Sequence, residues 1–377
     1  MNNKELAEIR RRFRPERSNI CRVSGCLINE KKEIAGIFDQ PLGELHPQLT
    51  EQLLPVLRRT LTGKLGRNLF DLAFTTRQVS EGEGQKLLER LRRTGLGDRE
   101  ALQALYDRIR TSFDWEGNYL ILLTREEYDV PEHTASGHPG ESVSTYTYLL
   151  CSVCPVRSAK LPTLGFALSE NLLRCFTTDP CVAKPEVGFL YPSFEGRSAN
   201  LYGALYYCRS LQSNHPEFTD AVFGVAPPPS VTAQKEAFHS VVAESAGEDC
   251  SYAVVEGVRE QIAGMVESHK AERNPDPLYV TAPVLRDALC ASGMDPSHGE
   301  EFVRRYDEAF GAGTELCPGN LLDPQRLILT TPDVSIRVSP DRGDLIETRR
   351  IDGVPCIVIR AEGEVRLNGV LLQIGDM

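Results

Sequence analysis

The sequence lacks long runs of apolar residues. No stretch approaches the roughly 18 apolar residues that a membrane-spanning helix needs. The opening residues, MNNKELAEIRRRF, contain no apolar segment of the kind that directs secretion. The 11 cysteines are an odd number without a repeating spacing, which favours reduced thiols over a disulfide framework. We therefore expect a cytoplasmic protein that does not contact membranes.

Several catalytic and nucleotide-binding motifs are also missing. The chain has no GxSxG sequence, and its glycine-rich stretches, EGEG at 81–84 and Gly63 with Gly66, match neither a P-loop nor a dinucleotide-binding fingerprint. These absences argue against classical nucleotide-binding and α/β-hydrolase machinery. We expect no cofactor.

Positive charge is scarce overall but is unevenly distributed. The chain has 42 Lys and Arg against 53 Asp and Glu, a formal net charge of −11, which makes unspecific attraction to nucleic acid or anionic lipid unfavourable. Residues 1–125 nevertheless carry 22 basic and 17 acidic side chains. This asymmetry fits either domains packed by complementary charge or a separate polyanion-binding surface in the N-terminal third.

Helical and strand patterns alternate along the first 225 residues. Apolar stripes with N-cap residues predict helices after Asn2 or Asn3, after Asp98 and after several other positions, and β-rich runs flank a predicted turn at 29–32. A polar loop is predicted at 129–141 between two strands. This pattern predicts an α+β fold in which helices cover a mixed sheet.

Proline-rich breaks predict three parts in the chain. The run Pro227-Pro228-Pro229 and the stretch at 274–277 separate a mixed-sheet domain at 1–225, a helical connecting segment at 226–277, and a C-terminal part at 278–377. The last part begins with a helix pair. Asp352-Gly353 and Asn368-Gly369 then lie between apolar runs, which predicts a C-terminal antiparallel β-meander.

Four cysteines have the residue type of a zinc site. Cys151 and Cys154 form a CxxC pair, and Cys175 and Cys181 follow with five residues between them, a looser spacing than a zinc knuckle requires. The CxxC lies in a β-rich run, where residues three apart point to opposite faces. Buried structural cysteines are favoured, while zinc and redox functions stay open as alternatives, and we predict no metal ligands.

The segment at 189–207, FLYPSFEGRSANLYGALYY, concentrates six aromatic residues, and we call it the aromatic segment. We expect a helix at 199–209 with Ser198 as its N-cap. Arg197, Ser198 and Asn200 at the start of this helix, with Tyr206 as support, could then bind an anionic group. The alternative is a core helix whose tyrosines bond backbone acceptors and whose Arg197 forms a structural ion pair.

The chain resembles a known family through several of its segments. These are the opening NNKELAEIRRRFRPERSNICRVSGC, then EGNYLILL, LLCSVCPV, GFLYPSFEGRSANLYGALYY and DAVFG, and the closing ETRRIDG. They are similar to the bacterial domain-of-unknown-function family numbered 4317, from Met1 to about Val370. The resemblance implies a full-length globular bacterial protein and assigns no activity or site residues.

These observations favour a binding or accessory protein that acts through protein interfaces, with a protein or a small anionic molecule as its partner. One alternative is an enzyme that acts on an anionic small molecule near Arg197 and Tyr206. Nucleic-acid binding through the basic N-terminal third is a further alternative, which the overall acidity disfavours.

Overall fold

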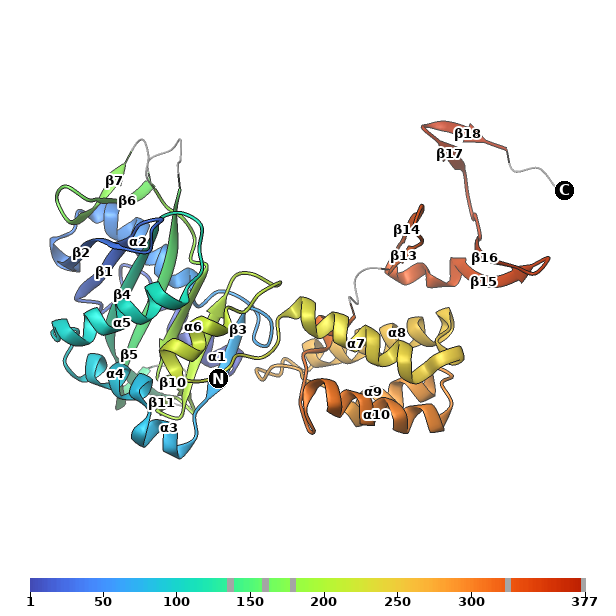
Figure 1. Cartoon of the computed structure of the whole chain (residues 1–377), viewed down its shortest axis with the longest axis horizontal. Coiled ribbons are helices and arrows are strands. Elements are labelled where there is room, and N and C mark those ends of the chain that lie inside the picture. The colour runs from blue at the N-terminus through green and yellow to red at the C-terminus, as the bar shows by residue number, and fades with distance from the viewer. Residues whose placement is uncertain (134–138, 158–162, 177–180, 323–326, 374–377) are drawn as a thin grey trace. The chain divides into compact units, whose positions relative to one another are not determined.

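The protein was analysed as a computed structural model, which describes residues 1–133, 139–157, 163–176, 181–322 and 327–373 (Figure 1). The chain divides into two compact units. The first unit contains Met1–Ala233 and Pro275–Pro277, and the second contains Gln234–Asn274 and Leu278–Met377. Among the described residues, no helix has both the length and the apolar character that crossing a bilayer requires. The division of the sequence at residues 225 and 277 stays a prediction.

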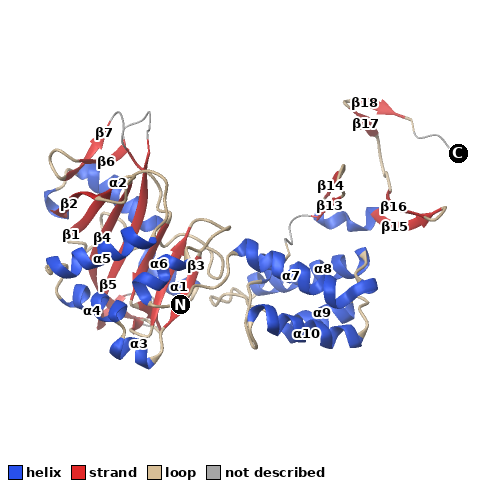
Figure 2. Ribbon diagram, viewed as in Figure 1, coloured by secondary structure: helices blue, strands red, loops and turns tan. Residues whose placement is uncertain are grey.

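The strands of the first unit are short except for two long central ones (Figure 2). They are β1 (Arg22–Ile28), β2 (Ile34–Pro41), β3 (Leu69–Ala73), β4 (Tyr119–His133), β5 (Pro139–Arg157), β6 (Thr163–Ala167), β7 (Leu172–Phe176), β8 (Cys181–Val182), β9 (Val187–Tyr191), β10 (Ser193–Glu195), β11 (Ser198–Asn200) and β12 (Gly203–Cys208). The helices of this unit are α1 (Asn3–Arg10), α2 (Pro47–Arg59), α3 (Thr76–Glu81), α4 (Glu83–Arg93), α5 (Arg99–Ser112) and α6 (Pro216–Phe223).

The main sheet has the strand order β2-β1-β4-β5-β9-β12-β3, with β8 paired to β5 off this path. Every described pairing between these strands is antiparallel, so the α+β class is confirmed while the sheet is antiparallel and not mixed. The reason is local connection: β1 joins β2, and β4 joins β5, through hairpins instead of crossover helices. The prediction of a polar loop at 129–141 is largely wrong, because Asp129 pairs with Thr145 inside the long strands β4 and β5. Residues 134–138 of this predicted loop lie outside the described part of the chain.

Helices cover both faces of the sheet, so the first unit has two hydrophobic cores. On one face, α1 and α2 pack through Leu6, Leu53 and Leu57 against side chains such as Leu122 and Leu150. On the other face, the core contains residues of α4, α5 and α6 together with the alternate side chains of the same strands. Because both faces are buried, the central strands read as continuous apolar runs and show no clear alternation.

Capping residues set several helix ends as the sequence predicts. The Asn2 side chain accepts hydrogen bonds from the backbone of Lys4 and Glu5 at the start of α1, and Asp98 accepts one from Ala101 at the start of α5. These side chains satisfy N–H groups that have no partner within the first turn of a helix.

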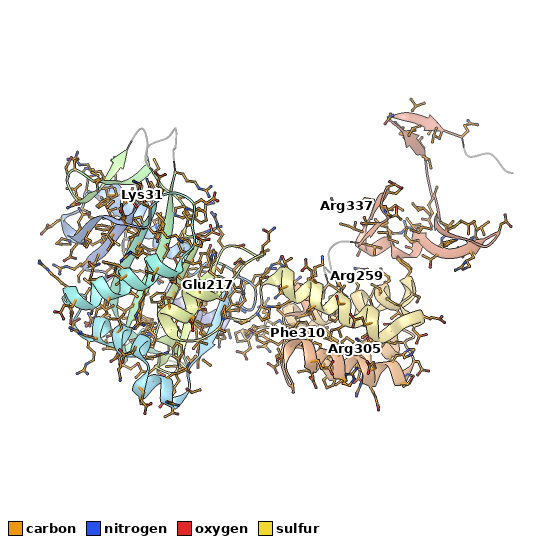
Figure 3. The ribbon with its side chains drawn as sticks, in the orientation of Figure 1. Lys31, Glu217, Arg259, Arg305, Phe310 and Arg337 are labelled. Atoms are coloured by element: carbon orange, nitrogen blue, oxygen red, sulfur yellow. The ribbon has the colours of Figure 1, made fainter. Side chains whose placement is uncertain are left out.

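The second unit begins with a bundle of helices around a third core. The helices are α7 (Val231–Ala246), α8 (Tyr252–Ala271), α9 (Ala282–Ala291), α10 (Pro296–Phe310) and the short α11 (Pro318–Leu321). Figure 3 labels Arg259 and Arg305, which lie in two of these helices. Arg305 of α10 pairs with Glu244 of α7, and Arg259 forms an ion pair of 2.6 Å with Glu256 inside α8, with both side chains buried.

The C-terminal residues form three separate hairpins, where the sequence predicted one meander. The strands are β13 (Leu327–Thr330), β14 (Ser335–Val338), β15 (Ile346–Ile351), β16 (Val354–Ile359), β17 (Val365–Leu367) and β18 (Val370–Leu372), each paired only with its neighbour in sequence. Both predicted turns are confirmed. Asp352-Gly353 and Asn368-Gly369 have positive φ at both residues, as a tight two-residue hairpin turn requires.

Candidate functional site

The aromatic segment is not helical after Gly196, so the helix predicted at 199–209 is wrong. Residues 198–200 form β11, which pairs with β10, and residues 203–208 form β12 inside the main sheet. Gly196 and Arg197 make the tight turn between β10 and β11, with φ of 56° and 57°. Ser198 is therefore a strand residue opposite Glu195 and caps no helix.

Arg197 is engaged by a carboxylate of the same unit. Its Nη2 donates to Oε1 of Glu8 on α1 at 2.8 Å, and this hydrogen bond raises the pKa of the guanidinium. The hydroxyl of Tyr128 donates to the same Oε1 at 2.7 Å. The cation that was predicted to bind a ligand thus holds the β10–β11 turn against the first helix.

The other predicted ligand residues also contact partners inside the unit. The Ser198 hydroxyl donates to the Glu195 carbonyl at 3.0 Å, and Asn200 Nδ2 donates to Glu195 Oε2 at 2.8 Å. Tyr206 is fully buried and donates to the carbonyl of Asn214 at 2.9 Å. It belongs to the core on the α4–α6 side of the sheet, whereas Arg197 contacts α1 on the other side. The structure does not bring these four residues together.

A buried carboxylate that the sequence gave no reason to select lies at the centre of a polar network. Glu126 is 1% exposed, and its Oε1 accepts from the Arg12 guanidinium at 2.9 Å and from the backbone N–H of Asn19 at 2.9 Å, while Tyr148 donates to Oε2. Burial raises the pKa of the Glu126 carboxyl, and these donors partly oppose that rise. Arg12 also lies over the Tyr128 ring at 4.8 Å. The network attaches the residues that follow α1 to strand β4.

The cysteines of the CxxC pair lie on opposite faces of β5, as a strand requires. Cys151 belongs to the core beside α4–α6 and Cys154 to the core beside α1 and α2. Burial raises the pKa of both thiols above the ordinary value. The Cys175 side chain lies outside the described part of the chain. Two thiols on opposite faces cannot bind one metal ion in the way a zinc knuckle does.

The C-terminal hairpins expose apolar side chains in a part of the chain that the sequence predicted only as a meander. We call the exposed apolar side chains of the β15–β16 hairpin the hairpin surface; they are Ile351 (43% exposed), Val354 (59%), Ile357 (37%) and Ile359 (51%). The separate β17–β18 hairpin exposes Leu367 (60%), Val370 (67%), Leu371 (51%) and Leu372 (42%). Large apolar side chains that are exposed together on one hairpin typically mark a contact site of a protein. A sequence signal existed, because β16 reads VPCIVI without a single polar or charged residue.

The edge of β16 favours contact through side chains over strand addition. Arg360 N donates to the Leu345 carbonyl at 2.8 Å, so the even-numbered residues of β16 direct their backbone groups to β15. The backbone nitrogen of Pro355 therefore faces the free edge, where it has no hydrogen to donate. For a partner, the free edge of β16 lacks one backbone donor, whereas the β16 side chains are apolar on both faces and lie next to the charged side chains of β15.

The comparisons with known proteins show which family the chain belongs to. The model of the family described as "Domain of unknown function (DUF4317)" matches residues 1–370. The chain belongs to this family, which confirms the resemblance seen in the sequence. Neither the curated proteins nor the solved structures contained a match to the chain.

Proposed function

We propose that this chain is a bacterial, cytoplasmic binding or accessory protein that acts through a protein–protein interface, and that the hairpin surface forms this interface with a second copy of the chain. The observation that carries the proposal is the exposure of the apolar strand β16 on both of its faces. A strand of this composition normally lies inside a protein, with both faces covered. Val354 is 59% exposed and Ile359 is 51% exposed, so neither face of β16 is covered within one chain.

A second copy of the chain can cover β16 without bringing like charges together. Like charges brought together across an interface destabilise the contact. Because β16 carries no charge, two copies can bring this strand together without such a pair. By contrast, β15 contains Arg349 and Arg350, so the same arrangement around β15 would oppose arginines. Closed dimers with a self-complementary patch are also the commonest form of soluble oligomer.

The cytoplasmic part of the proposal draws on cysteine chemistry. The ten cysteines whose side chains the structure describes are all free thiols. Free thiols in this number are typical of a reducing compartment. Exposed Cys21 and Cys250 would be open to oxidation outside it.

The test is the mass of the full chain in solution, measured by light scattering after size-exclusion chromatography. We expect twice the mass of one chain for the wild type and a single-chain mass for the double variant Ile357→Glu, Ile359→Glu. The matched control is Val284→Glu on α9, which replaces another exposed apolar residue (40% exposed) and should keep the wild-type mass. A wild type that stays monomeric at every concentration, or a control that dissociates like the double variant, would overturn the proposal.

A further inference from the structure

A cleft of about 600 Å³ opens between α4 and the aromatic segment, and we call it the α4 cleft. Its walls come from α4 on one side and from Tyr191 and Leu201 of the aromatic segment on the other. Figure 1 labels α4 and the nearby strand β11. Pockets that hold small molecules usually have volumes of about 300–1,000 Å³, so the cleft is large enough for one.

The wall formed by α4 is positively charged. Lys86, Arg90 and Arg93 follow one another at helical spacing and line the cleft together. Arg90 is paired with Asp98, and the nearest carboxylate oxygen to Lys86 lies 4.0 Å away in a solvent-exposed pair. Arg93 forms no ion pair with any residue that the structure describes. The cleft therefore holds at least one cation whose charge is not balanced locally.

The acidic residue in the cleft is neutralised. The carboxylate of Glu89 receives two hydrogen bonds from Arg92, at 2.8 and 2.7 Å. This bidentate geometry is the strongest form of such a pair. Glu89 thus offers little negative charge to repel an anion in the cleft.

Tyr191 supplies a hydrogen-bond donor to the cleft. Tyr191 is 1% exposed and lines the cleft. Burial raises the pKa of Tyr191 to about 12, with a smaller contribution from the Glu89 carboxylate, so the hydroxyl stays protonated at neutral pH.

We propose that the α4 cleft binds a small molecule that carries a phosphate or carboxylate group next to an apolar part. Arg93 and Lys86 attract the oxyanion, and the Tyr191 hydroxyl donates a hydrogen bond to one of its oxygens. The apolar part packs against Val79 and Leu201, which also line the cleft. This proposal is independent of the hairpin surface, which lies in the other unit.

The test is isothermal titration of the full chain with three probes. Phenyl phosphate carries both features of the ligand, inorganic phosphate carries the anion alone, and benzyl alcohol carries the ring without a charge. We expect phenyl phosphate to bind more tightly than either of the others. Arg93→Ala should weaken its binding about tenfold or more, since a hydrogen bond to a charged group is lost, and Tyr191→Phe should weaken it about threefold to tenfold.

A matched control and a mapping experiment make the test specific. Arg77→Ala removes an exposed cation from the neighbouring helix α3, outside the cleft, and should bind phenyl phosphate like the wild type. In hydrogen–deuterium exchange, phenyl phosphate should protect residues 83–93 and 187–191. The proposal fails if benzyl alcohol binds as well as phenyl phosphate or if Arg93→Ala binds like Arg77→Ala. It also fails if neither phosphate probe binds at millimolar concentration, or if the protection appears elsewhere.

Discussion

The guanidinium of Arg197 lies 2.8 Å from the carboxylate of Glu8, and this ion pair joins the β10–β11 turn to the first helix. Both side chains are largely shielded from solvent, with exposed fractions of 24% and 18%. A pair in such a position is screened less than one on the open surface. Arg197 makes this pair from a turn position with a φ of 57°, where glycine or asparagine is more usual.

Replacing Arg197 should therefore affect stability more than ligand binding. We expect Arg197→Ala to lower the free energy of unfolding by roughly 1–3 kcal/mol, because Glu8 loses a charged hydrogen-bond donor. Arg197→Gly should cost about 1 kcal/mol less, since glycine tolerates the positive φ of this turn. Denaturant titrations of the two variants measure both effects. Unchanged stability in Arg197→Ala, with a loss of binding to an anionic ligand, would instead support the site predicted from the sequence.

The close approach of β9 to β5 and α2 makes Gly188 sensitive to substitution. A Cβ at this position would lie 2.4 Å from the Cys151 carbonyl oxygen and 2.6 Å from the Thr60 methyl group. We expect Gly188→Ala to destabilise the protein by about 1–3 kcal/mol. The control is Gly264→Ala in α8, where a Cβ meets nothing within 4 Å and should stabilise by about 0.5–1 kcal/mol. Thermal unfolding gives the melting temperatures of both variants. A shift of both melting temperatures in the same direction would contradict this account.

His215 should make the protein less stable in mild acid. Burial lowers the pKa of this histidine below its ordinary value near 6.5, and its ring lies 5.3 Å from that of Phe113. Glu186, Glu217 and Asp114 oppose this shift only in part. The folded state thus favours the neutral imidazole of His215. The stability that this histidine contributes is therefore present above about pH 6.5, and it is lost as the pH falls through the lowered pKa of His215 in the folded state.

The pH experiment compares His215→Asn with the wild type, because asparagine accepts the positive φ of 46° at this position. We expect the melting temperature of the wild type to fall more than that of the variant between about pH 7.5 and pH 5. His269→Gln on α8 is the control and should follow the wild type. Parallel curves for all three proteins would rule out His215 as a source of acid sensitivity.

Cysteine labelling should separate the thiols by exposure. Cys21 and Cys250 are exposed and should react with iodoacetamide in the native protein, whereas Cys151 and Cys154 should react only after unfolding. Cys356 lies on β16, so self-association should slow its labelling, and the double variant Ile357→Glu, Ile359→Glu should restore it. Mass spectrometry of the labelled peptides gives each rate. Rapid native labelling of Cys151 would contradict the buried position of the CxxC pair.

Local signals allowed much of the fold to be predicted from the sequence. Asn2 and Asp98 cap their helices, and the Asp-Gly and Asn-Gly turns form hairpins, because these residue types act through nearby backbone groups alone. The α+β class follows from the alternation of such signals. None of them depends on contacts between distant parts of the chain.

The aromatic segment shows where local reasoning failed. Its run LYGALYYC predicts part of a helix, but β12 is buried on both faces between β9 and β3, so its side chains are apolar without alternation. Gly203 also has a reason that only the fold reveals, since a Cβ there would lie 2.6 Å from the Ser193 hydroxyl. Pairing with strands distant in sequence outweighed local propensity.

The α4 cleft could not be predicted from the sequence for a related reason. Its cations lie around residues 86–93 and its tyrosine is residue 191, so only the folded sheet brings them together. In the sequence, Arg93 is one of several arginines on an ordinary charged helix. Its lack of an ion pair among the described residues becomes visible only when its surroundings are known.

Glu126 has a further consequence for how the sheet assembles. A slip of one residue between neighbouring strands moves every side chain to the opposite face. Residues 119–123 of β4 are apolar and buried on both faces, so these side chains alone would penalise such a slip only weakly. The slip would, however, push the Glu126 carboxylate into the core beside α4–α6, away from Arg12 and Tyr148. The buried Glu126 carboxylate thus favours one register between β4 and β5, together with Arg125, Glu127 and Asp129, whose charged side chains the same slip would move to the opposite face.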